Sequence, residues 1–89
     1  MTKEEILNEL KKVIAPYTTN KEMLAGIDDN TDLIKDLKIN SANLVDIIID
    51  AEAKYDIEID YDSADKMVNV GNCIAVISEK MKEKNEQHG

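Results

Sequence analysis

Apolar residues recur at the spacing of an α-helix over most of this chain, and this periodicity constrains the fold more than any other feature. Ile6, Leu10 and Ile14 lie four positions apart near the start, so they share one face of a helix. The segment YDIEID, residues 55–60, alternates like a β-strand, but nothing else in the chain can pair with it. We read it as an extended connector with Ile57 and Ile59 pointing inward, and the sequence predicts an all-α protein.

Start and stop signals divide this pattern into four helices. Residues 2–5, TKEE, have the pattern of a capping box, and Pro16 ends the first helix. The second helix is expected from about Ser41 to Lys54, a short third one from near Asp62, and the last one after an N-cap at Asn69. The inward residues of the last helix are Val70, Ile74, Ile77 and Met81. The sequence predicts a small four-helix bundle with a short third helix.

A long connection, residues 17–40, separates the first two helices. Ile27, Leu33 and Leu37 are spaced along it and are expected to hold it against the core, because long free loops are unusual in compact domains. A short helical turn is expected within residues 27–37. With 89 residues the chain forms one domain, which we place at residues 1–82, followed by a polar C-terminal tail at residues 83–89.

Charge and composition exclude several classes of function. The formal net charge of −8 opposes nucleic acid phosphates and favours partners with basic surfaces. No apolar run approaches the roughly 20 residues of a membrane span, and the N-terminus lacks the uninterrupted apolar segment of a signal peptide. We therefore expect a cytoplasmic protein that does not bind nucleic acid and has no membrane span. We also expect it to be a monomer.

The single cysteine and the single histidine limit the chemistry further. Cys73 cannot form a disulfide within the chain, and its apolar neighbours predict a buried structural thiol. His88 lies in the polar tail, which argues against a histidine-based catalytic dyad or a His-rich metal site. The acidic runs DDNTDLIKDLKI and DYDSAD do not place ligands and glycine where a calcium loop requires them. We expect no metal site and no enzymatic activity.

The second helix carries more apolar residues than one buried face needs. On a helical wheel the core face consists of Leu44, Ile47, Ile48, Ala51 and Tyr55. Val45 and Ile49 fall at its edge, in line with Ser41, while Asp46 is on the exposed side. An exposed apolar ridge beside carboxylates is typical of a docking surface.

Ser41 itself has two interpretations. Asn-Ser before an apolar run is what an ordinary helix start looks like, so Ser41 can be an N-cap alone. As a nucleophile it lacks a neighbouring base, so another protein would have to activate it. A helix N-terminus also favours an attached phosphate.

The stretch DLKINSANLVDIIIDAEAKYDIEID, residues 36–60, resembles the centre of acyl carrier proteins. Asp36-Leu37 opens the pattern of that family, and Ser41 takes the position of its serine. The residues that follow in register are Glu52, Tyr55, Asp56, Ile57 and Ile59. The likeness extends from about Thr31 to Ile77, with similar length and acidity. It implies the four-helix fold of that family.

The resemblance also implies a function. In this family a phosphopantetheinyl transferase moves 4'-phosphopantetheine from coenzyme A onto the serine, here Ser41, which makes the chain a phosphoprotein. The thiol of this arm carries acyl groups as thioesters to acyl-processing enzymes with basic docking patches, in fatty acid or polyketide type biosynthesis. The chain would be a carrier and a substrate of enzymes, not an enzyme.

Matching positions assign further residues. The docking residues implied by the resemblance are Asp36, Val45, Asp46, Ile49 and Glu52, with Asp56 and Asp65 at the rim. An acyl chain would be sheltered between the helices by residues such as Ile47, Ile48, Ile59, Ala64 and Ile74.

Four positions depart from the family pattern. Asn40 and Ala42 replace the usual Asp and Leu around the serine, Lys38 replaces a common Gly, and Asp60 replaces a common Pro. These changes are compatible with a specialised carrier outside bulk fatty acid synthesis. Two alternatives remain open at this point: a peptidyl or aminoacyl carrier, and an acidic helical interaction domain that is never modified.

Overall fold

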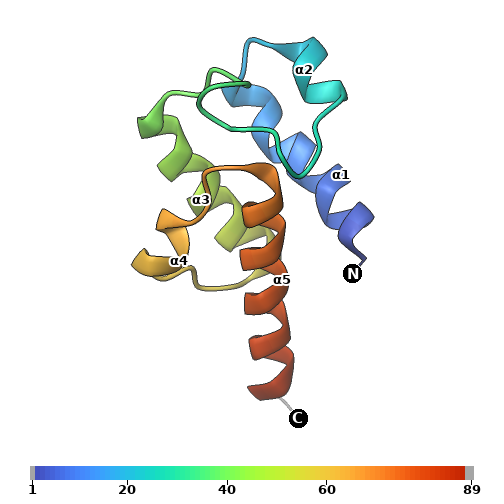
Figure 1. Cartoon of the computed structure of the whole chain (residues 1–89). Helices are drawn as coiled ribbons and strands as arrows, with labels where there is room; N and C mark the ends of the chain where they lie inside the picture. Colours follow the sequence, from blue (N-terminus) through green and yellow to red (C-terminus); the bar gives the residue numbers. More distant parts are fainter. Residues whose placement is uncertain (1, 88–89) are drawn as a thin grey trace.

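Three helices form the body of the protein, and two short ones flank it (Figure 1). The computed structural model describes residues 2–87. The long helices are α1 (Lys3–Ile14), α3 (Ser41–Tyr55) and α5 (Val70–Gln87), and the short ones are α2 (Lys21–Ala25) and α4 (Tyr61–Asp65). α1 packs against α3 and α5, and α3 packs against α5. The predicted all-α bundle with a short helix before the last one is confirmed.

Capping residues set the ends of the elements much as the sequence predicts. The Thr2 hydroxyl accepts a hydrogen bond from the Glu5 N–H at 3.2 Å and the Glu5 carboxylate faces the Thr2 N–H, which completes the capping box. Pro16 lies in a 3-10 turn, Ala15–Tyr17, directly after α1. Asn69 accepts from the Asn72 N–H at 2.8 Å and begins α5.

The connection between α1 and α3 is more structured than the sequence suggests. It contains α2, which we did not predict and which begins at an Asn20 N-cap. The expected turn forms over residues 32–37, where the Asp32 carbonyl accepts from both the Asp36 and the Leu37 N–H. Thr31 and Asp32 also pair with the segment before α5, through the Val70 N–H to the Thr31 carbonyl at 3.0 Å and an antiparallel bridge between Asp32 and Asn69.

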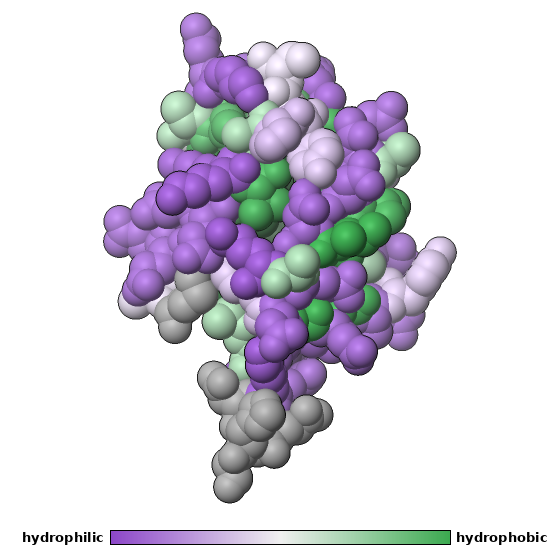
Figure 2. Space-filling view, turned by 180° about the vertical axis from the view of Figure 1, so that it is seen from behind, coloured by the Kyte–Doolittle hydropathy of each residue, from purple (hydrophilic) through white to green (hydrophobic). Residues whose placement is uncertain are grey.

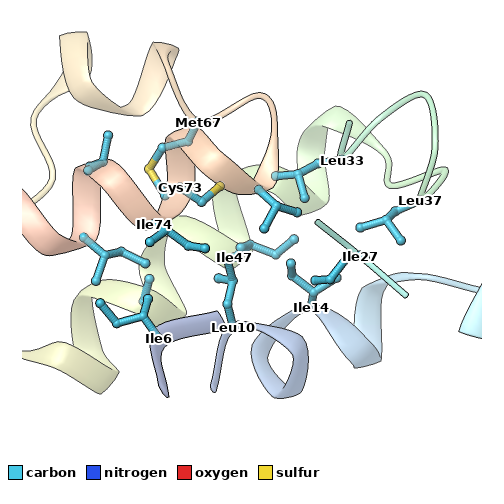
Figure 3. Close-up of a cluster of buried hydrophobic side chains, with 14 of the residues drawn as sticks. Ile6, Leu10, Ile14, Ile27, Leu33, Leu37, Ile47, Met67, Cys73 and Ile74 are labelled. Atoms are coloured by element: carbon cyan, nitrogen blue, oxygen red, sulfur yellow. The ribbon is translucent and has the colours of Figure 1, made fainter. Parts of the chain in front are cut away.

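The core is a single cluster of aliphatic side chains (Figure 3). Figure 3 shows side chains of α1, α3 and α5 meeting those of the connection, with Met67 and Cys73 adjacent at one end. Ile27, Leu33 and Leu37 are buried in this cluster, so the connection is fixed along its length as predicted. Ile57 is buried and Ile59 is partly buried, which confirms the inward connector between α3 and α4.

The C-terminal helix is longer than the sequence pattern indicates. α5 continues to Gln87, so residues 83–87 of the expected polar tail are helical, and residues 88–89 lie outside the described residues. The division of the chain at residue 82 stays a prediction. Within residues 2–87, the structure has no helix that is both long and apolar enough to cross a bilayer.

Candidate functional site

Ser41 is the first residue of α3, and its side chain is exposed. Asn40, not Ser41, is the N-cap: its backbone is extended (φ −66°, ψ 141°) and its Oδ1 accepts from the Ala42 N–H at 2.8 Å. The interpretation of Ser41 as a simple N-cap is therefore wrong, because Asn40 already fills that role. Ser41 is therefore the first residue of α3, and its hydroxyl is not needed to cap the helix.

The segment before Ser41 is held firmly in place. Its side chains alternate, with Leu37 and Ile39 buried in the core and Lys38 and Asn40 exposed. The Thr18 hydroxyl donates to the Leu37 carbonyl at 2.6 Å, in a buried environment. A serine that follows such a segment has a fixed position relative to the rest of the fold.

Lys38 has a left-handed backbone, with φ of 58°. Side chains other than glycine adopt this region rarely, which explains why a glycine is common at this position in the pattern that the chain resembles. The left-handed residue turns the chain between the two buried residues Leu37 and Ile39. Lys38 therefore adopts a backbone conformation that glycine adopts more easily.

The outer ridge, which we define as Ser41, Val45 and Ile49, is open to solvent. Val45 is 55% exposed and Ile49 is 54% exposed, although both are large and apolar. Figure 2 shows the opposite face of the molecule from Figure 1, where hydrophobic side chains reach the surface between hydrophilic ones. The sequence places the three ridge residues one helical turn apart, and the structure confirms their exposure.

The carboxylates assigned to docking differ in how they are used. Asp46 and Asp65 are exposed. Asp36 is half-buried and its Oδ2 accepts from the Asp32 N–H at 2.8 Å. Glu52 is also half-buried, and its Oε2 accepts from the Ile59 N–H at 2.9 Å. Asp36 and Glu52 thus stabilise the backbone of this chain, a role that their spacing in the sequence does not reveal.

Two further interactions of carboxylates alter pKa values near these helices. Asp50 on α3 accepts a hydrogen bond from the Tyr17 hydroxyl at 2.7 Å, and this bond raises the pKa of Tyr17. Asp32 accepts from the Ile34 and Lys35 N–H groups, and the bond from Lys35 is the main reason that the pKa of Asp32 is lowered. Both carboxylates therefore help to fix the connection next to α3.

Two lysines of α5 form ion pairs with the segment that joins α3 to α4. Asp56 ends α3 with a left-handed backbone (φ 53°), and its Oδ2 lies 2.7 Å from the Lys84 Nζ. Asp60 lies 2.8 Å from the Lys80 Nζ, and this bond is the main cause that lowers the pKa of Asp60. A groove of about 590 Å³ runs here between the connector and α5. Sequence reasoning missed both lysines, because each ion pair joins residues at least 20 positions apart.

The residues assigned to an acyl pocket differ in burial. Ile47 and Ile74 are buried, while Ile48, Ile59 and Ala64 are half-buried. They come from α3, the connector, α4 and α5. Ile47 and Ile74 belong to the apolar core cluster, and Ile48 and Ile59 pack against it.

Cys73 lies in this cluster with 0% of its surface exposed. Burial raises the pKa of its thiol to about 12. The prediction of a buried structural thiol is confirmed, because a thiol that stays protonated and enclosed is neither a nucleophile nor a metal ligand.

Comparisons with known proteins identify relatives over most of the chain. No protein-family model matches it. An acyl carrier protein of Lactobacillus acidophilus is 35% identical over 78 residues, which cover 86% of this chain and 94% of that protein. One from Desulforapulum autotrophicum is 36% identical over 77 residues, 81% of this chain and 92% of that protein.

A solved structure has the same fold. An acyl carrier protein of Enterococcus faecalis superimposes with a TM-score of 0.73 over 90% of this chain and 99% of that chain, at 24% identity. At that identity the likeness supports the fold alone, and it agrees with the arrangement of helices in Figure 1.

Proposed function

This chain belongs to the acyl carrier protein family, whose members are carriers and not enzymes, and we propose that it carries acyl groups on a 4'-phosphopantetheine arm attached to Ser41. The single observation that carries the assignment to Ser41 is its exposed hydroxyl at the start of α3, left available by the Asn40 cap. When attached, the arm supplies a terminal thiol that holds the acyl group as a thioester.

The residues around Ser41 fit such an attachment. Asn40 and Ala42 have no ionisable side chain, so the base that takes the hydroxyl proton has to come from the phosphopantetheinyl transferase. The N-terminus of a 15-residue helix favours a phosphate by about 0.3–1 kcal/mol. The buried residues Leu37 and Ile39 keep this helix end in one position, which suits a tether that different enzymes must find.

The outer ridge and the exposed carboxylates support docking of the acyl-processing enzymes. Val45 and Ile49 would contact apolar side chains of a partner, and Asp46 would attract its basic ones. Asp65 and Asp56 would contribute at the rim of this docking surface, whereas Asp36 and Glu52 would contribute mainly through their hydrogen bonds to the backbone. We propose enzymes of fatty acid or polyketide type biosynthesis as these partners.

The test is covalent loading of Ser41. The unmodified protein is incubated with coenzyme A, magnesium and a broad-specificity phosphopantetheinyl transferase, and its intact mass is measured. We expect the mass of one phosphopantetheine group to be added to the wild type and to Ser78→Ala, a control that removes another exposed helical serine. Ser41→Ala should gain nothing. A wild type that stays unmodified would favour an acidic interaction domain instead.

A further inference from the structure

α4 is the least firmly packed helix of the described chain. It has five residues, and none of them is buried, whereas α1, α2 and α3 each bury at least one side chain. Ser63 and Ala64 are half-buried. Because burial of apolar surface is the main stabilising contribution, α4 depends more than the other helices on contacts at its ends.

The N-terminal end of α4 is fixed by Asp60. Its carboxylate accepts from the Ser63 N–H at 3.3 Å and from the Ser63 hydroxyl at 2.7 Å, as an N-cap. The same carboxylate lies 2.8 Å from the Nζ of Lys80 on α5, and that lysine side chain is only 17% exposed. Glu83 is a more distant second partner of Lys80, at 3.6 Å. The Asp60–Lys80 pair thus joins α4 to the long helix behind it.

Apolar side chains near α4 belong to the packed core. Met67, two residues after α4, and Ile74 on α5 are buried, and Ile59, two residues before α4, is partly buried. Figure 3 shows Met67 adjacent to Cys73 and Ile74. Protein interiors are packed as densely as organic crystals, so an alkyl chain of several carbons can enter here only if an element moves. The element with the fewest buried contacts to lose is α4.

Resting on the proposed function, we propose that the Asp60–Lys80 ion pair is a latch on α4, and that Lys80 is a positioning residue that limits how readily an attached acyl chain enters the interior. The latch stabilises the closed, empty arrangement. A ligand shifts a conformational equilibrium only by its preference for one state, so removal of the latch raises the fraction of acyl chains that are sheltered.

The chain offers a matched control. Lys84 lies one turn further along α5 and forms the same kind of pair, but with Asp56 at the end of the well-packed α3. Lys84→Gln therefore removes the same charge from the same helix without touching α4. Lys80→Arg keeps the charge and is the conservative rescue.

The first measurement is native-state hydrogen exchange on the unacylated protein. In Lys80→Gln the Ala64, Lys66 and Met67 N–H groups, which bond to the carbonyls of Asp60, Ser63 and Ala64, should exchange about threefold faster, as expected for loss of a partly exposed ion pair. Lys84→Gln and Lys80→Arg should match the wild type. Unchanged exchange in Lys80→Gln would show that the pair does not hold α4.

The second measurement uses the loaded protein with acetyl and octanoyl groups, and follows cleavage of each thioester by hydroxylamine. Lys80→Gln should slow octanoyl cleavage relative to acetyl cleavage by about threefold, whereas Lys84→Gln should leave the ratio unchanged. An unchanged or opposite ratio in Lys80→Gln would overturn the role of the latch in acyl shelter. Failure of the protein to accept the arm at all would instead contradict the proposed function, and the exchange measurement would still test the latch.

Discussion

The two sides of α3 are made of similar residues but do opposite things. Ile47, on the inner side, is fully buried, whereas Ile49, two positions on, is 54% exposed on the outer ridge. The inner side binds α3 to α1 and α5, and the outer ridge begins with the serine proposed to carry the arm. One helix therefore separates the residues that stabilise the fold from those that we propose to contact partners.

The largest effect should come from truncating the inner side. Ile47→Ala is expected to lower the free energy of unfolding by about 2–5 kcal/mol, because it removes buried methyl groups and leaves a cavity. Ile49→Ala should change it by no more than about 0.5 kcal/mol, while weakening transfer of acyl groups to partner enzymes. Urea unfolding of both variants gives the comparison. Equal losses of stability would show that the two sides are not functionally separate.

The second-largest effect on stability is expected at Gly71, where the start of α5 packs against the connection between α1 and α3. A Cβ added at Gly71 would lie 2.9 Å from the Asp29 carbonyl oxygen, closer than such atoms approach. We expect Gly71→Ala to destabilise the protein by about 1–3 kcal/mol. Gly26→Ala is the control, since nothing lies within 4 Å of its added Cβ. A thermal unfolding midpoint as low for Gly26→Ala as for Gly71→Ala would contradict this role of the close approach.

The smallest effect on stability is expected at Asn40 and Ser41, where α3 begins. Asn40→Ala should cost about 1 kcal/mol of stability, because the Ala42 N–H loses its acceptor. Asn40→Asp should keep the cap and the stability. Ser41→Ala should unfold like the wild type in the same denaturant titration. If Ser41→Ala were instead as destabilising as Asn40→Ala, the serine would share the capping role and the separation would be weaker.

The sequence was sufficient for much of this architecture. Helical spacing and capping signals predict α1, α3, α4 and α5, because each of these patterns is local. The same wheel that places Ile47 inward places Val45 and Ile49 outward, and the structure confirms all three. The serine position came from the resemblance of residues 36–60 to acyl carrier proteins, and its exposure is what the structure adds.

The features that the sequence did not reveal are of two kinds. Some depend on which of two neighbouring residues takes a role, and others depend on contacts between residues far apart in the chain. Asn40 and Ser41 are both good N-caps, and only the backbone geometry shows that Asn40 is the one used. α2 has only five residues, too few for a periodic pattern, so the sequence predicts a loop there. The contacts of Lys80 and Lys84 with the connector join residues 20 and 28 positions apart, and no spacing rule connects them.

The enclosure of Cys73 has a consequence for a protein that we propose to hold its acyl group as a thioester. Thioesters exchange readily with any nearby thiolate, so a second reactive sulfur would divert the cargo onto the carrier itself. Full burial and a pKa near 12 keep Cys73 from self-acylation and from forming a mixed disulfide with the arm. An interior cysteine of this kind is therefore compatible with the proposed thioester carrier.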